Sequence, residues 1–310
     1  MGGGGGGSGA TYFPSKPSKL QHLIRETHER TEQQRSEADI NLYLQQLLAK
    51  LTDRDPEKTK TYLDEIVSVL HDYQEVDRLL FGGSVAKHTY VDGLSDVDAL
   101  VVLNRDDLQG KSPQEVLNIF FDSLQGELTR DKVKDLKQGR LGVTVDYEDG
   151  TEIQLLPAIK RGKEILIADS NGADWKSINP KVFQRELSKA NERLNRALVP
   201  TIKIMKSTLS GLPDEVRPSG YHIEALCLDL TKGYKGPKTP KSLLQHVMLG
   251  AASRVLKPIT DVTNQSRYVD EYLGKPNSEQ RVRLSRELAG ISRRINAATT
   301  ADRWNEIIQG

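Results

Sequence analysis

The chain has 310 residues, of which 36% are hydrophobic and 28% are charged, a balance that is ordinary for a folded globular protein. Its 44 Lys and Arg nearly balance 43 Asp and Glu, and the formal net charge of +1 excludes a strong overall attraction to nucleic acid or to a membrane surface. No stretch approaches the ~20 apolar residues of a membrane span, and the N-terminal residues lack the basic start and apolar core that are typical of a secretory signal. Because Cys227 is the only cysteine, no internal disulfide can form, and we expect a cytoplasmic protein.

The first part of the chain predicts a tail and two helices. Residues 1–18 begin with a run of glycine that cannot bury apolar surface, so we expect a flexible tail. Apolar residues at helical spacing then run from 19 to 51, with an almost wholly polar middle that we expect to be exposed. Asp55 followed by Pro56 is typical of the start of a second helix.

The period of the hydrophobic pattern then changes. Residues 76–81 and 99–103 are typical of two short strands, and the sequence Ser-Pro-Gln-Glu at 112–115 is a capping box that begins a helix. Residues 143–156 predict a hairpin around a two-residue Asp-Gly turn. We expect no further strand after Pro157.

From Asn179-Pro180 onward nearly every segment has a helical pattern, as far as Trp304. The chain is therefore expected to divide into N-terminal helices with a mixed α/β core over 19–170 and a helical lobe over 171–310.

The segment between the first two strands carries the most specific chemical signal. Strand 76–81 runs into glycines that include Gly83, which let the backbone approach a ligand closely. The hydroxyl of Ser84 and the first amides of a short following helix would donate to a phosphate. Asp96 and Asp98 come next, on one face of the second strand. Two adjacent carboxylates repel each other and are stabilised by a divalent cation, which can bridge the phosphates of a nucleoside triphosphate.

This order of strand, Gly-Ser, helix, Asp-x-Asp and strand resembles the signature of DNA-polymerase-beta-type nucleotidyltransferases. More narrowly, the chain is similar to the bacterial CD-NTases, which are relatives of cyclic GMP–AMP synthase and oligoadenylate synthase in the anti-phage defence called CBASS. Residues 155–158 resemble the third catalytic strand of that family, 201–206 the helix whose lysines meet triphosphate, and 219–224 the segment that contacts the donor nucleotide. Residues 258–261 are similar to a loop near the base.

The resemblance implies an α+β fold: a polymerase-beta-type nucleotidyltransferase lobe, with a mixed sheet and flanking helices, plus an α-helical second lobe, and an active site in the cleft between them. It implies that Asp96 and Asp98 hold Mg²⁺ or Mn²⁺ and that the substrates are ATP and, with it, GTP or other triphosphates. The nucleotide-binding residues that it implies are Gly83, Ser84, Lys203, Lys206, Ser219 and Tyr221.

One departure from the family concerns the third carboxylate. Its position is taken by Gln154, whose neutral amide binds Mg²⁺ more weakly than a carboxylate and cannot act as a base. Glu152, two residues earlier on the same face, is the candidate substitute, so both residues are candidates for the catalytic set. We expect Asp146 to face away from them, because a two-residue turn would pair it with Ile153.

Several of these residues have an ordinary structural alternative. Lys203 and Lys206 share one helix face and either neutralise triphosphate or form a solvated basic stripe. Tyr221 either stacks on a base or belongs to the core. Gly220 separates Tyr221 from Ser219, which the family has side by side, so the role of Ser219 stays open.

The main functional hypothesis is an enzyme that joins nucleoside triphosphates into a cyclic di- or trinucleotide second messenger for anti-phage defence, which a separate effector protein reads. One alternative is nucleotidyl transfer to an RNA 3′ end, a protein or a small molecule. The other is a catalytically weakened nucleotide-binding protein. The final Gly310 adds a hypothesis of conjugation to a partner protein, because some CD-NTases resemble ubiquitin in this respect.

Overall fold

The structure is a computed structural model that describes residues 19–51, 56–73, 76–81, 97–103, 106–128, 132–169, 171–263 and 267–309. Gly83, Ser84, Asp96 and Gly310 lie outside these ranges, and so do the glycine-rich tail and the short helix predicted after Ser84. For Asp98 only the backbone is described.

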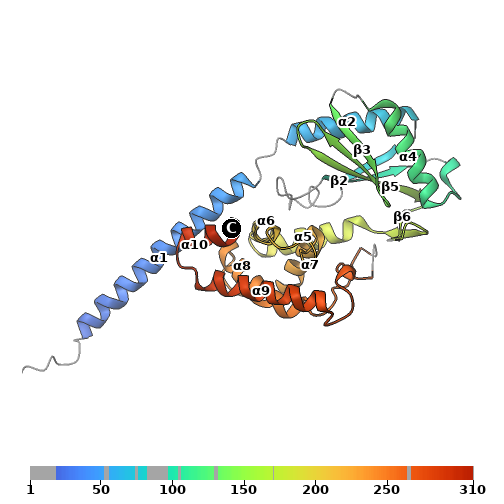
Figure 1. The fold of residues 1–310 in the computed structure, drawn as a ribbon. Helices are drawn as coiled ribbons and strands as arrows, with labels where there is room; N and C mark the ends of the chain where they lie inside the picture. The colour runs from blue at the N-terminus through green and yellow to red at the C-terminus, as the bar shows by residue number, and fades with distance from the viewer. Residues whose placement is uncertain are drawn as a thin grey trace, which may run out of the picture.

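The described residues form a mixed sheet with helices, followed by a helical lobe (Figure 1). The sheet part contains α2 (Pro56–Tyr73), β1 (Val76–Phe81), β2 (Val97–Leu103), the 3-10 helix η1 (Asp106–Leu108), α4 (Pro113–Glu127), β3 (Val133–Gln138), β4 (Val143–Tyr147), β5 (Glu152–Arg161), β6 (Glu164–Ala168) and β7 (Trp175–Ile178). The helical lobe contains α5 (Pro180–Arg193), α6 (Leu198–Ser210), α7 (Gly220–Leu230), α8 (Pro240–Arg254), the 3-10 helix η2 (Glu271–Leu273), α9 (Glu279–Ala297) and α10 (Ala301–Gln309). The helices predicted over 19–51, from Pro56 and from the capping box at 112–115 are confirmed, as are the strands at 76–81 and 99–103, and residues 143–156 form a hairpin.

The sheet has the strand order β1-β2-β5-β4-β3, with β6 added beside β5 and β7 beside β6. β2 and β5 are parallel, whereas the other pairs are antiparallel. Alternate side chains of a strand point to opposite faces, and Ala99, Val101 and Leu103 belong with Ile153 and Leu155 to one buried cluster. Helices α2 and α4 supply the other side of that cluster and cover this face of the sheet (Figure 1).

The sheet continues beyond the point where we predicted that strands end. β5 runs through Pro157, and β6 and β7 follow it, so the sheet extends past residue 170. At Pro157 the register pairs β5 with Val101 of β2, while pairing with β4 ends at Leu155 and pairing with β6 begins at Ile159. Proline lacks an N–H and is tolerated in a sheet where one side of the strand has no ladder partner. The prediction that strands stop at Pro157 was therefore wrong.

Two local sequence signals shape the sheet part. Ser112 accepts a hydrogen bond from the Glu115 amide at 3.3 Å, and the Glu115 carboxylate accepts one from the Ser112 amide at 2.8 Å, which is the predicted capping box of α4. Gly142 directly precedes β4, at a point where a Cβ atom would lie 2.4 Å from the Leu155 carbonyl oxygen, so a side chain there would push β4 away from β5.

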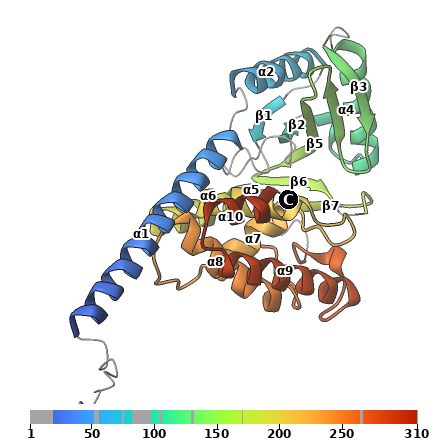
Figure 2. The same cartoon turned by 60° about the vertical axis from the view of Figure 1, so that its left-hand side comes forward.

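α1 (Lys19–Lys50) precedes the sheet in the chain but packs against the helical lobe (Figure 2). Its C-terminal half buries Ile40, Leu44 and Leu47 in the same core as α5 to α10. Residues 21–35 are exposed throughout, as predicted for the polar stretch that begins at Arg25, and the apolar Leu23 and Ile24 are exposed as well. The opposite end of the chain is anchored by Trp304 of α10, which is fully buried and donates its Nε1 hydrogen bond to the Ala298 carbonyl at 3.2 Å. Among the described helices, none is both long and apolar enough to span a bilayer.

Candidate functional site

The register of two central strands places one predicted metal ligand beside the position of the missing carboxylate. β2 and β5 run parallel, with Asp98 next to Gln154 and Leu100 next to Leu156. Gln154 is half-buried. By strand alternation it lies on the sheet face opposite to α2 and α4, because its neighbours Ile153 and Leu155 point into the core beneath those helices. Figures 1 and 2 both show the helical lobe on that second side of the sheet.

The hairpin next to this position differs from our prediction by one residue. The Tyr147 amide donates to the Thr151 carbonyl at 2.8 Å, and Gly150 has a φ of 84°, so the loop has three residues and ends in a left-handed glycine. This is a common hairpin connection, a turn followed by a glycine bulge. It pairs Asp146 with Glu152 rather than with Ile153.

Asp146 therefore lies on the same sheet face as Gln154, and the prediction that it points away was wrong. Its carboxylate is engaged by Lys137, whose Nζ lies 2.6 Å from Oδ2. Glu152, its cross-strand neighbour, is exposed. This face thus carries Asp146, Glu152 and Gln154 in adjoining register positions, next to the backbone of Asp98. Within the described part of the chain, no three acidic, His or Cys side chains gather in a ready-made metal site.

The second group of predicted residues lies at α6 and the start of α7. Lys206 is 5% exposed and Glu224 is 1% exposed, and their Nζ and Oε1 atoms are 2.9 Å apart. Lys206 is thus held in a buried ion pair rather than in a solvated stripe. Lys203, one turn earlier on α6, is half-buried; burial first, and the charge of Lys206 second, lower its pKa. A cation of lowered pKa is stabilised by an incoming anion, which makes Lys203 the stronger candidate for triphosphate.

The glycine that departs from the family pattern has a local reason. Gly220 is the first residue of α7, and a Cβ atom there would lie 3.4 Å from the Nζ of Lys206. The small residue therefore leaves room for the buried lysine. Ser219 is the N-cap of the same helix and accepts a hydrogen bond from the His222 amide at 3.2 Å.

Tyr221 lies on the first turn of α7 and is held at two points. Its hydroxyl donates to Asp261 Oδ1 at 2.7 Å. Its ring meets the edge of Phe183 from α5, with centroids 4.9 Å apart and an angle of 66°. Tyr221 is only partly buried, so it belongs to the core at one edge and remains accessible at another. Burial and the bond to Asp261 both raise its pKa, so the hydroxyl stays a donor.

A buried polar network supports this end of α7 from below. Asp270 pairs with Arg281 at 2.6 Å, and both side chains are completely buried. His222 shares a 2.8 Å hydrogen bond with the Tyr272 hydroxyl through Nδ1, and its Nε2 lies 3.8 Å from Asp270. Burial lowers the pKa of His222 to about 4, although the charge of Asp270 opposes that shift. His222 is therefore a neutral, packed histidine.

Comparison with known proteins decides the family. Residues 35–191, which make up half of the chain, match the profile of SMODS, the Second Messenger Oligonucleotide or Dinucleotide Synthetase domain. The chain belongs to the SMODS family.

Solved structures of bacterial CD-NTases have the same fold. CdnC from E. coli MS115-1, determined with ATP, has a TM-score of 0.64 at 16% identity and covers 82% of this chain and 90% of its own. CdnG from Bradyrhizobium diazoefficiens, in complex with GTP, has a TM-score of 0.64 at 12% identity, and the match covers 87% of this chain and 97% of CdnG. DncV from Vibrio cholerae, a cyclic AMP-GMP synthase in complex with nonhydrolyzable GTP, has a TM-score of 0.62 at 12% identity, and the match covers 95% of this chain and 91% of DncV. No curated protein sequence matches the chain.

The predicted fold, a polymerase-beta-type nucleotidyltransferase lobe plus a helical lobe, is thereby confirmed. This is the fold that the chain shares with the solved CD-NTase structures.

Sequence reasoning missed the partners that hold two of the predicted site residues in place. Glu224 lies in the apolar run 223–228, and a single carboxylate in such a run is a signal for a buried partner. The identity of that partner, Lys206 on another helix, needed the fold. Similarly, nothing in the sequence around Tyr221 indicates that Asp261 accepts its hydroxyl.

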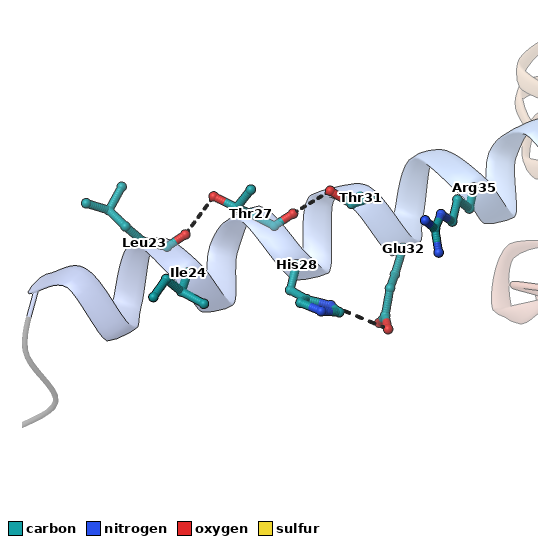
Figure 3. Close-up of a pocket in the computed structure, with 7 residues that line it drawn as sticks. All are labelled: Leu23, Ile24, Thr27, His28, Thr31, Glu32 and Arg35. Carbon is teal, nitrogen blue, oxygen red and sulfur yellow. Dashed lines mark hydrogen bonds and ion pairs between the residues drawn. The ribbon is translucent and has the colours of Figure 1, made fainter.

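A surface hollow elsewhere in this SMODS protein is not a candidate active site. It has a volume of about 520 Å³ and lies on the exposed half of α1 (Figure 3). It is lined by Leu23, Ile24, Thr27, His28, Thr31, Glu32 and Arg35. All of these residues come from one helix, and none is among the predicted site residues. The chemistry is therefore sought on the sheet face and at the start of α7.

Proposed function

We propose that the protein is a nucleotidyltransferase that joins nucleoside triphosphates into a cyclic di- or trinucleotide second messenger. The observation that carries this proposal is the register of β2 and β5, which sets the second aspartate of the Asp-x-Asp motif beside Gln154 on adjoining central strands. The membership of the SMODS family supports the same reaction class.

The donor atoms in this region fit a divalent cation. Asp96 and Asp98 would hold Mg²⁺ or Mn²⁺, with the amide oxygen of Gln154 as a neutral neighbour, and oxygen ligands are those that these ions prefer. When bound, the cation neutralises phosphate charge and lowers the pKa of the attacking hydroxyl. Glu152 and Asp146 lie on the same face and would add negative charge nearby.

The protein's own groups would position the substrate. Gly83 and Ser84 would cradle the donor phosphates with backbone amides and a hydroxyl. Lys203 would neutralise triphosphate from α6, while Lys206 supports α7 through its buried pair with Glu224. Tyr221 would offer its ring to a base. Catalysis of phosphoryl transfer depends mainly on such positioning and charge neutralisation.

Three further parts of the proposal concern the cell. The messenger would act in anti-phage defence, a separate effector protein would read it, and Gly310 would be the point of conjugation to a partner protein. Deletion of Gly310 tests the last part, because unchanged conjugation in the presence of the partner ligase would contradict it.

A second candidate function rests on Gln154. A neutral amide beside Asp98 is the arrangement expected of a protein that binds nucleotide and turns it over slowly or not at all.

One experiment separates the two candidates. Purified protein is incubated with the four radiolabelled nucleoside triphosphates and Mg²⁺ or Mn²⁺, then with phosphatase, and resistant products are separated. A cyclic product that disappears in an Asp96→Ala/Asp98→Ala variant supports the synthase. Product only after Gln154→Asp supports the weakened enzyme. The absence of product from both, with retained ATP binding, contradicts the synthase.

A further inference from the structure

Asp261 is a buried carboxylate that accepts hydrogen bonds from groups of the protein itself. It is 3% exposed. Its Oδ1 accepts the Tyr221 hydroxyl at 2.7 Å, the Thr263 amide at 2.8 Å and the Thr263 hydroxyl at 2.7 Å. A carboxylate that is removed from water needs such donors, because burial without them is costly. Asp261 therefore faces inward, toward Tyr221, and not outward toward solvent.

The loop that carries Asp261 is anchored at several independent points. The Ile259 amide donates to Asp270 Oδ1 at 3.0 Å, and Asp270 is itself fixed by its buried pair with Arg281. The Asp261 amide donates to the carbonyl oxygen of residue 267 at 3.2 Å. These bonds hold the loop against α9, so the Asp261 carboxylate has a defined position.

The same loop also contacts the connection between the sheet and the helical lobe. The Asn179 amide donates to the Thr263 carbonyl at 3.2 Å, and Asn179 is the residue between β7 and α5. Trp175 at the start of β7 donates its Nε1 hydrogen bond to the Lys111 carbonyl at 2.8 Å. The turn at 261–263 is thus fixed to the chain segment that leads from one part of the molecule to the other.

The contacts with Phe183 and Asp261 fix the side-chain conformation of Tyr221. A tyrosine ring on a helix has two rotatable side-chain angles. The edge contact with Phe183 restricts the ring at one side, and the Asp261 bond fixes the hydroxyl at its far end. The ring is partly exposed in this single orientation.

We propose that Asp261 is a positioning residue that orients the Tyr221 ring for stacking on the nucleotide base, and that it does not itself read the base. This inference rests on the proposed function, because it assumes that a base lies on Tyr221. It assigns the base and the phosphates to separable groups: Tyr221 with Asp261 for the base, and Lys203 for the triphosphate.

The test compares two probes that differ in the presence of a base. The binding of a nonhydrolysable ATP analogue is measured by calorimetry, and the binding of inorganic tripolyphosphate is measured in the same buffer. Tyr221→Phe keeps the ring and removes only its anchor, which is a hydrogen bond worth a roughly two- to tenfold change in affinity. Asp261→Ala removes the acceptor, and Asp261→Asn keeps an oxygen at the same place. Tyr43→Phe is the matched control, since the Tyr43 hydroxyl also donates to a side-chain carbonyl, that of Asn305, at 3.1 Å.

The expected result is weaker binding of the ATP analogue by Tyr221→Phe and by Asp261→Ala, by similar factors, with tripolyphosphate binding unchanged. Asp261→Asn should restore most of the affinity for the analogue, and Tyr43→Phe should match the native chain. Equal loss for both probes would overturn the proposal, because it would show a general structural role. So would a loss in Asp261→Asn with none in Tyr221→Phe, because Asp261 would then act on the base directly.

The assay needs no turnover. A native chain that binds the ATP analogue and forms no product would overturn the proposed synthase and leave this comparison valid. A native chain that binds tripolyphosphate but not the analogue would overturn the assignment of Tyr221 and Asp261.

Discussion

The buried ion pair between Lys206 and Glu224 makes a strong prediction about which lysine of α6 meets the substrate. The two side chains are 5% and 1% exposed, and their charged atoms are 2.9 Å apart. Removal of one partner from such a pair leaves the other charge buried and costs about 3–5 kcal/mol of stability. Lys206→Met and Glu224→Gln should therefore both destabilise the helical lobe by about that amount.

The size of the effect can be measured by thermal unfolding. For a folding unit of about 150–250 residues, 1 kcal/mol shifts the midpoint by about 2–4 °C, so each variant should lose roughly 6–20 °C. The double variant Lys206→Met/Glu224→Leu buries no charge and should recover most of the loss, since replacing a buried pair by apolar groups is often neutral. Lys189→Met removes one partner of an exposed pair on α5 and should change stability by less than about 1 kcal/mol.

Variants of Lys203 and Lys206 separate a structural role of these lysines from a substrate-binding role. Lys203→Met should weaken tripolyphosphate binding while leaving the unfolding midpoint nearly unchanged, because Lys203 is only half-buried. The reasoning would be refuted if Lys206→Met kept its thermal midpoint and bound tripolyphosphate at least about tenfold more weakly. That result would show that Lys206 is a phosphate ligand whose pairing with Glu224 is of little consequence.

Three further predictions concern stability. Ser112→Ala removes the side-chain cap of α4 and should cost about 1 kcal/mol, measured by urea unfolding, whereas Ser112→Asp should keep the cap. Because the folded-state pKa of His222 is lowered to about 4, the unfolded chain binds more protons between that value and the ordinary ~6.5, so stability should fall as the pH drops through this window. The slope should approach 1.4 kcal/mol per pH unit for this one group, and His222→Gln should flatten it. Trp304→Ala should cost about 3–5 kcal/mol and detach α10, seen as faster proteolysis at the C-terminus; full retention of the native midpoint would contradict its place in the core.

Much of the fold followed from local signals that the structure confirms. The capping box at Ser112, the proline at the start of α2 and the continuous apolar run 99–103 of β2 each specify one element without reference to the rest of the chain. β6 and β7 were missed because they are only five and four residues long and sit at the end of the sheet. Short strands of this kind are formed by pairing with a neighbour, and β6 exists because β5 continues past Pro157 to meet it.

The sequence predicts the motif of the candidate site, but it could not predict the register of the strands beside that motif. A hairpin turn of two or three residues fits the same Asp-Gly sequence, yet the choice decides whether Asp146 shares a face with Gln154. The roles of Lys203 and Lys206 could not be separated from sequence, because two lysines one turn apart are equivalent until a carboxylate from another helix is brought to one of them. Long-range partners such as Glu224 and Asp261 depend on packing that no local pattern encodes.

α1 unites a packed half and an exposed half in one continuous helix. A helical segment of about 15 residues is marginally stable alone in water, because the first turn is costly to form. The exposed residues 21–35 therefore extend a helix that is nucleated where Ile40, Leu44 and Leu47 are buried. Amide hydrogen exchange should rise steadily from Leu47 toward Leu23, so that the first turns open many times for each global unfolding event. The helical conformation of the exposed half therefore depends on the packing of the other half of α1 in the helical lobe.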